Sequence, residues 1–165
     1  MSRRSPAYAL FGVLLLLTTL HFIVPGLFGD ARFTPDFLLL ALLVYAIRAR
    51  PGQAAIAGFA VGLVADSLTP AAFGAGALAY TAVGYLAAWG KAVFFAENLF
   101  VNTGFIFIGV WIRDLLVLLV GRPVDNGVLV WQLALWSPVK ALVTAAAGAV
   151  TLAVFRRALE VRIGE

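Results

Sequence analysis

Six apolar stretches joined by short polar links make up most of this 165-residue chain. A helix needs about 20 apolar residues to cross the hydrocarbon core of a bilayer. Hydrophobic residues form 63% of the sequence and charged residues 12%, whereas a soluble domain carries about 25% charged residues. The sequence therefore predicts an all-α polytopic membrane protein, a single integral membrane domain over residues 1–165 with six transmembrane helices in one bundle.

The limits of the expected spans follow from the polar links and from proline. We expect spans at residues 7–28, 36–48, 53–68, 75–90, 98–120 and 130–156. The second is too short to cross a bilayer unless flanking residues help or the bilayer thins. Pro35 and Asp36 are good helix-start signals for it. The last stretch is longer than one span needs, and Ser137 with Pro138 either kinks that helix or starts it.

In a bundle of six spans the links alternate between the two sides of the membrane, and lysine and arginine are unevenly distributed between these sides. Two, Arg32 and Arg122, fall on one side of the predicted bundle. Eight fall on the other side, at the chain ends and in alternate links: Arg3, Arg4, Arg48, Arg50, Lys91, Arg156, Arg157 and Arg162. Cytoplasmic loops carry the excess of basic residues, so we expect both termini in the cytoplasm.

Five ionisable residues lie inside or at the edges of apolar stretches: Asp36, Asp66, Arg113, Asp114 and Lys140. A charge at the centre of a bilayer costs roughly 2.5 to 17 kcal/mol and is usually kept only where it has a partner or lines a site. The predicted topology places all five in the outer half or near the midplane. We expect them to form a buried charge network or to line a polar pocket that faces outwards.

Other interpretations of these charges stay open at this point. Asp66 is alternatively a hydrated carboxylate at a helix end, and Arg113 alternatively extends to the outer headgroups. Lys140 lies at the membrane surface if Ser137 begins the last helix. Successive helical side chains diverge by about 100°, so we expect Arg113 and Asp114 to find partners on different helices.

Glycines in the third and fourth stretches predict close helix packing. Gly58 and Gly62 form a small-xxx-small pattern, which lets two helix backbones approach each other. Gly84 adds a small residue to the fourth stretch. Trp131 and Trp136 are best interpreted as anchors at the outer interface.

The sequence offers little for catalysis or metal binding. His21 is the single histidine and cysteine is absent, so we expect no metal site and no cofactor. No nucleophile with an adjacent base is evident, and we expect no enzymatic activity. The net charge of +4 is spread among loops and ends without a basic stripe, which argues against nucleic-acid binding.

Two segments carry a family resemblance. They read PDFLLLALLVYAIRARPG (residues 35–52) and GFAVGLVADSLTPAAFGAGALAYTAVGYLAAW (residues 58–89). The chain resembles the rod shape-determining protein MreD family, in which a helix led by Pro-Asp precedes a glycine-rich helix ending in Asp and a helix bearing Gly-Tyr. The matching positions are Pro35, Asp36, Gly58, Gly62, Asp66, Gly74, Gly84 and Tyr85. Lys140 departs from the family pattern.

The resemblance implies a non-catalytic scaffold or regulator of cell elongation in the bacterial cytoplasmic membrane. It implies MreC as a direct partner, and MreB, RodA and a penicillin-binding transpeptidase in the same complex, organised for peptidoglycan synthesis. The family fold also resembles the substrate-binding subunits of energy-coupling-factor transporters, so a vitamin-type binding subunit is the alternative function. Dimerisation stays open.

Overall fold

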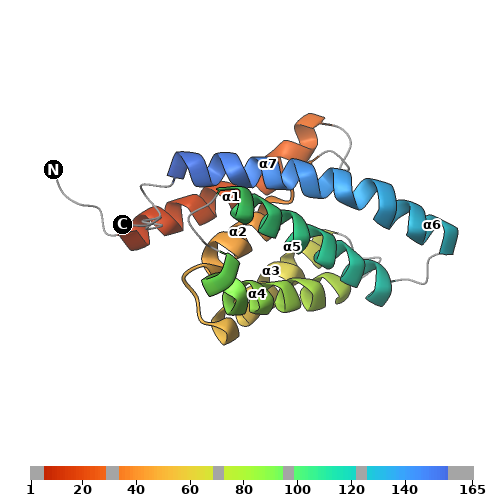
Figure 1. Cartoon of the computed structure of the whole chain (residues 1–165), viewed down its shortest axis with the longest axis horizontal. Helices are drawn as coiled ribbons and strands as arrows, with labels where there is room; N and C mark the ends of the chain where they lie inside the picture. Colours follow the sequence, from red (N-terminus) through yellow and green to blue (C-terminus); the bar gives the residue numbers. More distant parts are fainter. Residues whose placement is uncertain (1–5, 29–33, 69–72, 95–98, 122–125, 156–165) are drawn as a thin grey trace.

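A computed structural model describes residues 6–28, 34–68, 73–94, 99–121 and 126–155, and every regular element in these ranges is helical. The helices are α1 (Pro6–Phe28), α2 (Phe37–Ala46), α3 (Pro51–Leu68), α4 (Ala75–Phe94), α5 (Leu99–Val120), α6 (Asn126–Trp131), the π-helical turn η2 (Gln132–Trp136) and α7 (Ser137–Phe155). The start of α1 and the end of α7 lie at the same end of the bundle (Figure 1). The prediction of an all-helical protein is confirmed.

The short helix α2 forms the centre of the bundle. Nine of its ten residues are buried, and it contacts α1, α3, α4, α5 and α7. A helix that is hydrophobic on all sides is stable when neighbours cover every side. With ten residues its length is about 15 Å, half the thickness of the hydrocarbon core. The expected second span is therefore a helix enclosed along its length, and its first turn begins inside the protein, at the buried Asp36.

Three helical segments in the described ranges are long and apolar enough to cross a membrane: Pro51–Leu68, Val101–Val120 and Gln132–Phe155. Leu10–Val24 and Phe37–Ala46 are shorter apolar segments. The composition of these helices supports the prediction of a membrane protein. The number of spans remains a prediction.

Helices α3 and α4 pack backbone against backbone. A Cβ atom at Gly58 would collide with the carbonyl group of Tyr80, and one at Gly62 would collide with the backbone of Ala77. At Gly84 the added atom would lie 2.6 Å from the carbonyl oxygen of Ala54. The absence of a side chain at these three glycines allows the two helices to approach this closely.

The final helical stretch begins at Asn126, four residues before its expected start, and continues through Pro138. Immediately before the proline, the Ser137 amide donates to the carbonyl of Gln132, five residues back, as in a π-helix. Proline has no amide hydrogen, so Pro138 cannot continue this pattern by donating to Leu133. Trp111 Nε1 on α5 donates to the Leu133 carbonyl instead, at 3.3 Å. Pro138 therefore neither starts nor ends the helix.

Candidate functional site: a buried charge network

Asp36 is the N-cap of α2 and lies in the middle of the protein. Its Oδ1 accepts the Leu39 amide at 3.0 Å, which satisfies one of the free N–H groups of the first helical turn. Its own amide donates to Thr144 Oγ1 on α7, also at 3.0 Å. Asp36 is only 1% exposed. Because α2 is short and enclosed, its capping carboxylate is held where a charge needs a partner.

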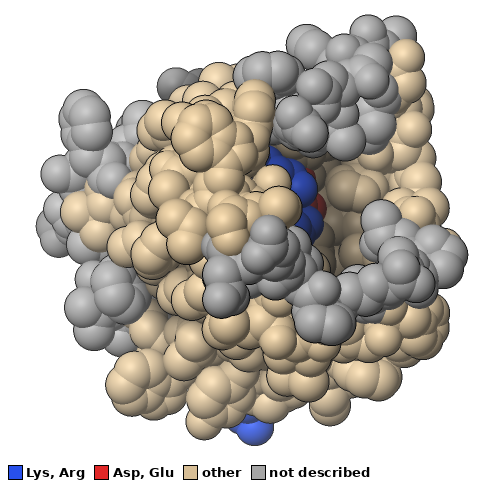
Figure 2. Space-filling model, turned by 90° about the vertical axis from the view of Figure 1, so that its right-hand side faces the viewer, with Lys and Arg blue, Asp and Glu red and all other residues tan. Residues whose placement is uncertain are grey.

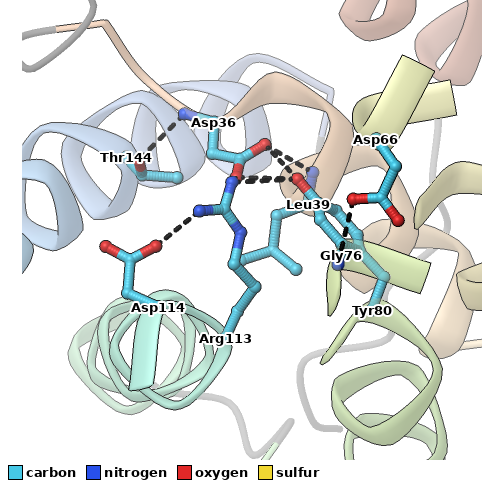
Figure 3. A network of polar contacts seen from close by, with 8 residues as sticks. All are labelled: Asp36, Leu39, Asp66, Gly76, Tyr80, Arg113, Asp114 and Thr144. Carbon is cyan, nitrogen blue, oxygen red and sulfur yellow. Dashed lines mark hydrogen bonds and ion pairs between the residues drawn. The ribbon is translucent and has the colours of Figure 1, made fainter. Parts of the chain in front are cut away.

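Arg113 on α5 provides that partner. Its Nη2 forms an ion pair with Asp36 Oδ2, and it also donates to the hydroxyl of Tyr80 at 3.1 Å (Figure 3). The Tyr80 hydroxyl, from α4, in turn donates to both oxygens of Asp36, at 3.0 and 2.9 Å. The guanidinium carbon lies 5.2 Å from the centre of the Tyr80 ring. These contacts tie α4 and α5 to the start of α2.

Asp114 pairs with the preceding residue on its own helix. Arg113 Nη1 forms an ion pair with Asp114 Oδ1 (Figure 3). The expectation that these two neighbours would find partners on different helices is therefore wrong for Asp114. The long arginine side chain allows its guanidinium to contact Asp36 with one nitrogen and Asp114 with the other. Arg113 is largely buried, and its guanidinium lies between these carboxylates.

Asp66 has a different role from the network. Its carboxylate, at the end of α3, accepts three amides at the start of α4: Gly74 at 2.8 Å, Gly76 at 3.0 Å and Ala77 at 2.9 Å. Figure 3 shows the bond from Gly76. A carboxylate is favourable there because the free N–H groups of a helix start carry partial positive charge. Gly74 has a φ of +97°, which favours glycine. Within the described residues Asp66 forms no ion pair and caps the following helix instead.

Lys140 lies near the network but makes no ion pair or hydrogen bond with any residue that the structure describes. It interacts electrostatically with Arg113, Asp36 and Asp114. The helix continues upstream of Pro138 to Asn126, so Lys140 is near the middle of a long helical stretch. Lys140 therefore does not lie at a free helix start, and its depth in the membrane stays a prediction.

Tyr80 and Thr144 belong to the network, and sequence reasoning missed both. Tyr80 is 1% exposed and lies in a helix otherwise rich in small residues. A buried tyrosine hydroxyl usually has a hydrogen-bond partner, and this signal was available in the sequence. Thr144 offered no comparable signal, because helical threonines commonly bond to their own backbone.

The geometry of the network favours a structural role over a reactive one. Both oxygens of Asp36 accept hydrogen bonds, and its burial leaves no room for a substrate beside it. Among the described residues, no three histidine, cysteine, aspartate or glutamate side chains come together to hold a metal ion. The contacts of Asp36 with Thr144, Tyr80 and Arg113 connect the start of α2 to α7, α4 and α5.

An all-helical protein whose described part holds three helical segments long and apolar enough to cross a membrane belongs to the class of membrane proteins. Residues 2–155 match the family model described as rod shape-determining protein MreD. The chain therefore belongs to the MreD family. No curated protein and no solved structure matches it, so the expected similarity to energy-coupling-factor subunits gains no support.

Proposed function

We propose that this chain is a non-catalytic scaffold of the rod-shape machinery, which binds MreC and helps to organise peptidoglycan synthesis with MreB, RodA and a penicillin-binding transpeptidase. Membership of the MreD family supports a role in rod-shape determination. The observation that carries the scaffold role is the network itself, in which Arg113 is shared by two carboxylates from α2 and α5. A site whose charges satisfy one another holds helices in one arrangement.

We place the chain in the bacterial cytoplasmic membrane with six spans and both termini in the cytoplasm. The excess of Lys and Arg in one set of links supports this orientation. The positions of the start of α1 and the end of α7 at one end of the bundle agree with an even number of crossings (Figure 1). Reporter fusions at Glu165 and after Asp125 should report opposite sides of the membrane, and equal signals would contradict the topology.

The family resemblance implies that MreC is a single-span membrane protein, and an apolar groove on α3 and α4 is the surface that we assign to its transmembrane helix. Small residues line it, including Ala55, Ala77 and Ala82, and Phe59 and Tyr85 contribute large side chains. Small residues let a second helix approach closely, and large neighbours then pack around it. A single apolar helix from a partner fits this chemistry.

The network supports one wall of this groove. Tyr80 on α4 faces Asp36 and Arg113, while Ala77 and Thr81, on the same helix, line the groove. Loss of Arg113 would release the Tyr80 hydroxyl and let α4 shift. The charges would thus influence partner binding through helix position, without touching the partner.

Co-purification of tagged MreC in mild detergent tests the assignment. Ala82→Leu, which fills the groove, should reduce MreC capture several-fold while the folded yield stays at the parental level. Ala146→Leu adds the same side chain to an exposed site on α7 and should leave capture unchanged. Equal capture by both variants would place the MreC surface elsewhere.

A further inference from the structure

The helical stretch from Asn126 to Phe155 is packed along only part of its length. No residue of η2 is buried, and the residues of α6 whose side chains the structure describes are exposed. In the described residues α6 contacts mainly the π-helical turn that follows it, whereas α7 packs along α5. Burial begins at the start of α7 and recurs along one face, at Ser137, Ala141, Thr144, Ala145, Gly148 and Leu152. Residues 126–136 therefore form an arm at one end of the molecule (Figure 1).

The arm joins α7 where a helix bends most readily. A proline inside a helix has no amide hydrogen, and its ring collides with the carbonyl four residues back, which for Pro138 is that of Ala134. The π-helical turn Gln132–Trp136, which ends two residues before this proline, widens the backbone there. Helices kink at prolines and at π-helical turns. Both features lie where the burial of the stretch begins, so residues 132–138 have the properties of a hinge.

Trp111 on α5 ties the arm to the bundle. Its indole N–H donates to the Leu133 carbonyl at 3.3 Å, and this bond is exposed. The distance is slightly longer than in most hydrogen bonds of this kind. One neutral hydrogen bond changes the ratio of two populations about fivefold. A bond of this strength favours one position of the arm without fixing it there.

Ser137 offers a second donor for the same carbonyl. Its side chain is fully buried, and its Oγ has no hydrogen-bond partner in the part of the chain that the structure describes. A serine hydroxyl in a helix commonly donates to the carbonyl four residues back, which here is that of Leu133. If the indole moves away, this hydroxyl can replace it, and the Leu133 carbonyl is not left unsatisfied in apolar surroundings.

The surroundings of the arm allow a movement at little cost. Figure 2 views the end of the molecule where α6 lies and shows a hollow in the surface there. The side chains of Val128, Val130 and Trp131 are already more than half exposed. A displacement of the arm therefore uncovers little additional apolar surface, and segments with few buried contacts are the ones that open most easily.

We propose that residues 126–136 are a hinged arm that exchanges between two positions about the turn before Pro138. In the position that the structure shows, the Trp111 indole binds the Leu133 carbonyl. In the other, the Ser137 hydroxyl binds this carbonyl and the arm has moved away from α5. The charge network lies on the packed side of the hinge, so α5 and α7 keep their places. The exchange needs no partner protein and is independent of the groove assigned to MreC.

Distances between spin labels test the exchange directly. The chain contains no cysteine, so labels can be attached to pairs of introduced cysteines in lipid nanodiscs. The pair Leu119 and Val130 reports on α5 and the arm, and the pair Leu119 and Leu142 reports on α5 and the packed part of the stretch; all three side chains are exposed. The first pair should show two distances and the second pair one. Trp111→Phe should raise the ratio of the longer to the shorter arm distance about fivefold and leave the second pair unchanged.

Two further variants separate the hinge from its two donors. Pro138→Ala regains an amide that can donate to Leu133, so the first pair should show a single distance, also when this change is combined with Trp111→Phe. Ser137→Ala removes the second donor and should lower the population of the longer arm distance several-fold in the Trp111→Phe background.

Four outcomes would overturn the proposal. One is an arm distance that is the same in the parent and in Trp111→Phe. Another is equal broadening of both label pairs, since this would show a general loosening of α5 against α7. An unchanged arm distance after Ser137→Ala in the Trp111→Phe background would contradict the exchange of donors. If Trp111→Phe does not fold, Pro138→Ala alone decides, because a distance distribution identical to that of the parent contradicts a hinge.

Discussion

Arg113→Gln should be the most damaging single substitution in the charge network. It removes the cation that contacts Asp36, which is 1% exposed, and Asp114, whose side chain is 9% exposed. Glutamine is shorter and uncharged, so both buried carboxylates would lose the cation that they contact. Removing one partner of a buried ion pair typically costs about 3 to 5 kcal/mol. A loss of this size is a large fraction of a total stability of about 5 to 15 kcal/mol.

Variants that should lose less stability than Arg113→Gln test how the contacts rank in their contribution to stability. Asp114→Asn leaves Arg113 paired with Asp36 and bonded to Tyr80, so its cost should be smaller than that of Arg113→Gln. Arg48→Gln removes an exposed charge and should cost about 0 to 1 kcal/mol. The measurement is reversible unfolding in mixed micelles of mild detergent and dodecyl sulfate, followed by circular dichroism.

A double-mutant cycle then isolates the ion pair. Asp36→Asn keeps an oxygen to accept the Leu39 amide, so it removes the charge and preserves the helix cap. Combined with Arg113→Gln, it leaves neither member of that pair alone, and the double variant should be about 1 to 3 kcal/mol more stable than the sum of the single effects predicts. Additive effects, or an Arg113→Gln variant within about 1 kcal/mol of the parent, would refute the reasoning.

Three further substitutions test local contacts. Gly58→Ala should destabilise the protein by about 1 to 3 kcal/mol, because the added Cβ collides with the α4 backbone. Gly104→Ala is the control, since an added Cβ meets nothing there, and it should be neutral or stabilising. Equal melting temperatures of the two variants would contradict the tight packing of α3 against α4. Asp66→Asn should cost about 1.5 to 3 kcal/mol and speed hydrogen exchange at the amides that start α4, and unchanged exchange would argue against the cap. Trp111→Phe should lower the free energy of unfolding in dodecyl sulfate by about 1 kcal/mol, because it removes the indole donor to the Leu133 carbonyl. The loss should be smaller in a Pro138→Ala background, where residue 138 regains an amide that can donate to the same carbonyl. An equal loss in both backgrounds would show that the indole does not replace the donor that proline lacks.

Much of the helical arrangement was accessible from sequence because its signals are local. Apolar length predicted the helices, and Pro35 with Asp36 marked the start of α2 to within one residue. The cost of charge in lipid directed attention to Asp36, Arg113 and Asp114, which the structure brings together. Each of these predictions depends only on the sequence of one helix and on the apolar medium expected around it.

Other features depend on how helices meet and were not accessible. That Asp66 accepts amides across a turn was not predictable from the sequence, because this contact depends on the start of α4 lying beside the end of α3. The pairing of Asp114 with its neighbour depends on Arg113 being held by Asp36 from another helix. The π-helical turn before Pro138 is paired with a tryptophan on α5, a partner that no local pattern identifies.

The length of α2 explains why a charge network lies at the centre of this protein. A helix of about 15 Å enclosed by other helices begins inside the protein, where no water satisfies its first amides. Asp36 meets one of these amides with a carboxylate, and that carboxylate then requires a cation. Arg113 supplies the cation, Tyr80 satisfies the remaining acceptor capacity of Asp36, and Asp114 balances the excess donors of the guanidinium. Each polar residue thus follows from the one before it, from the cap of α2 to Asp114 on α5.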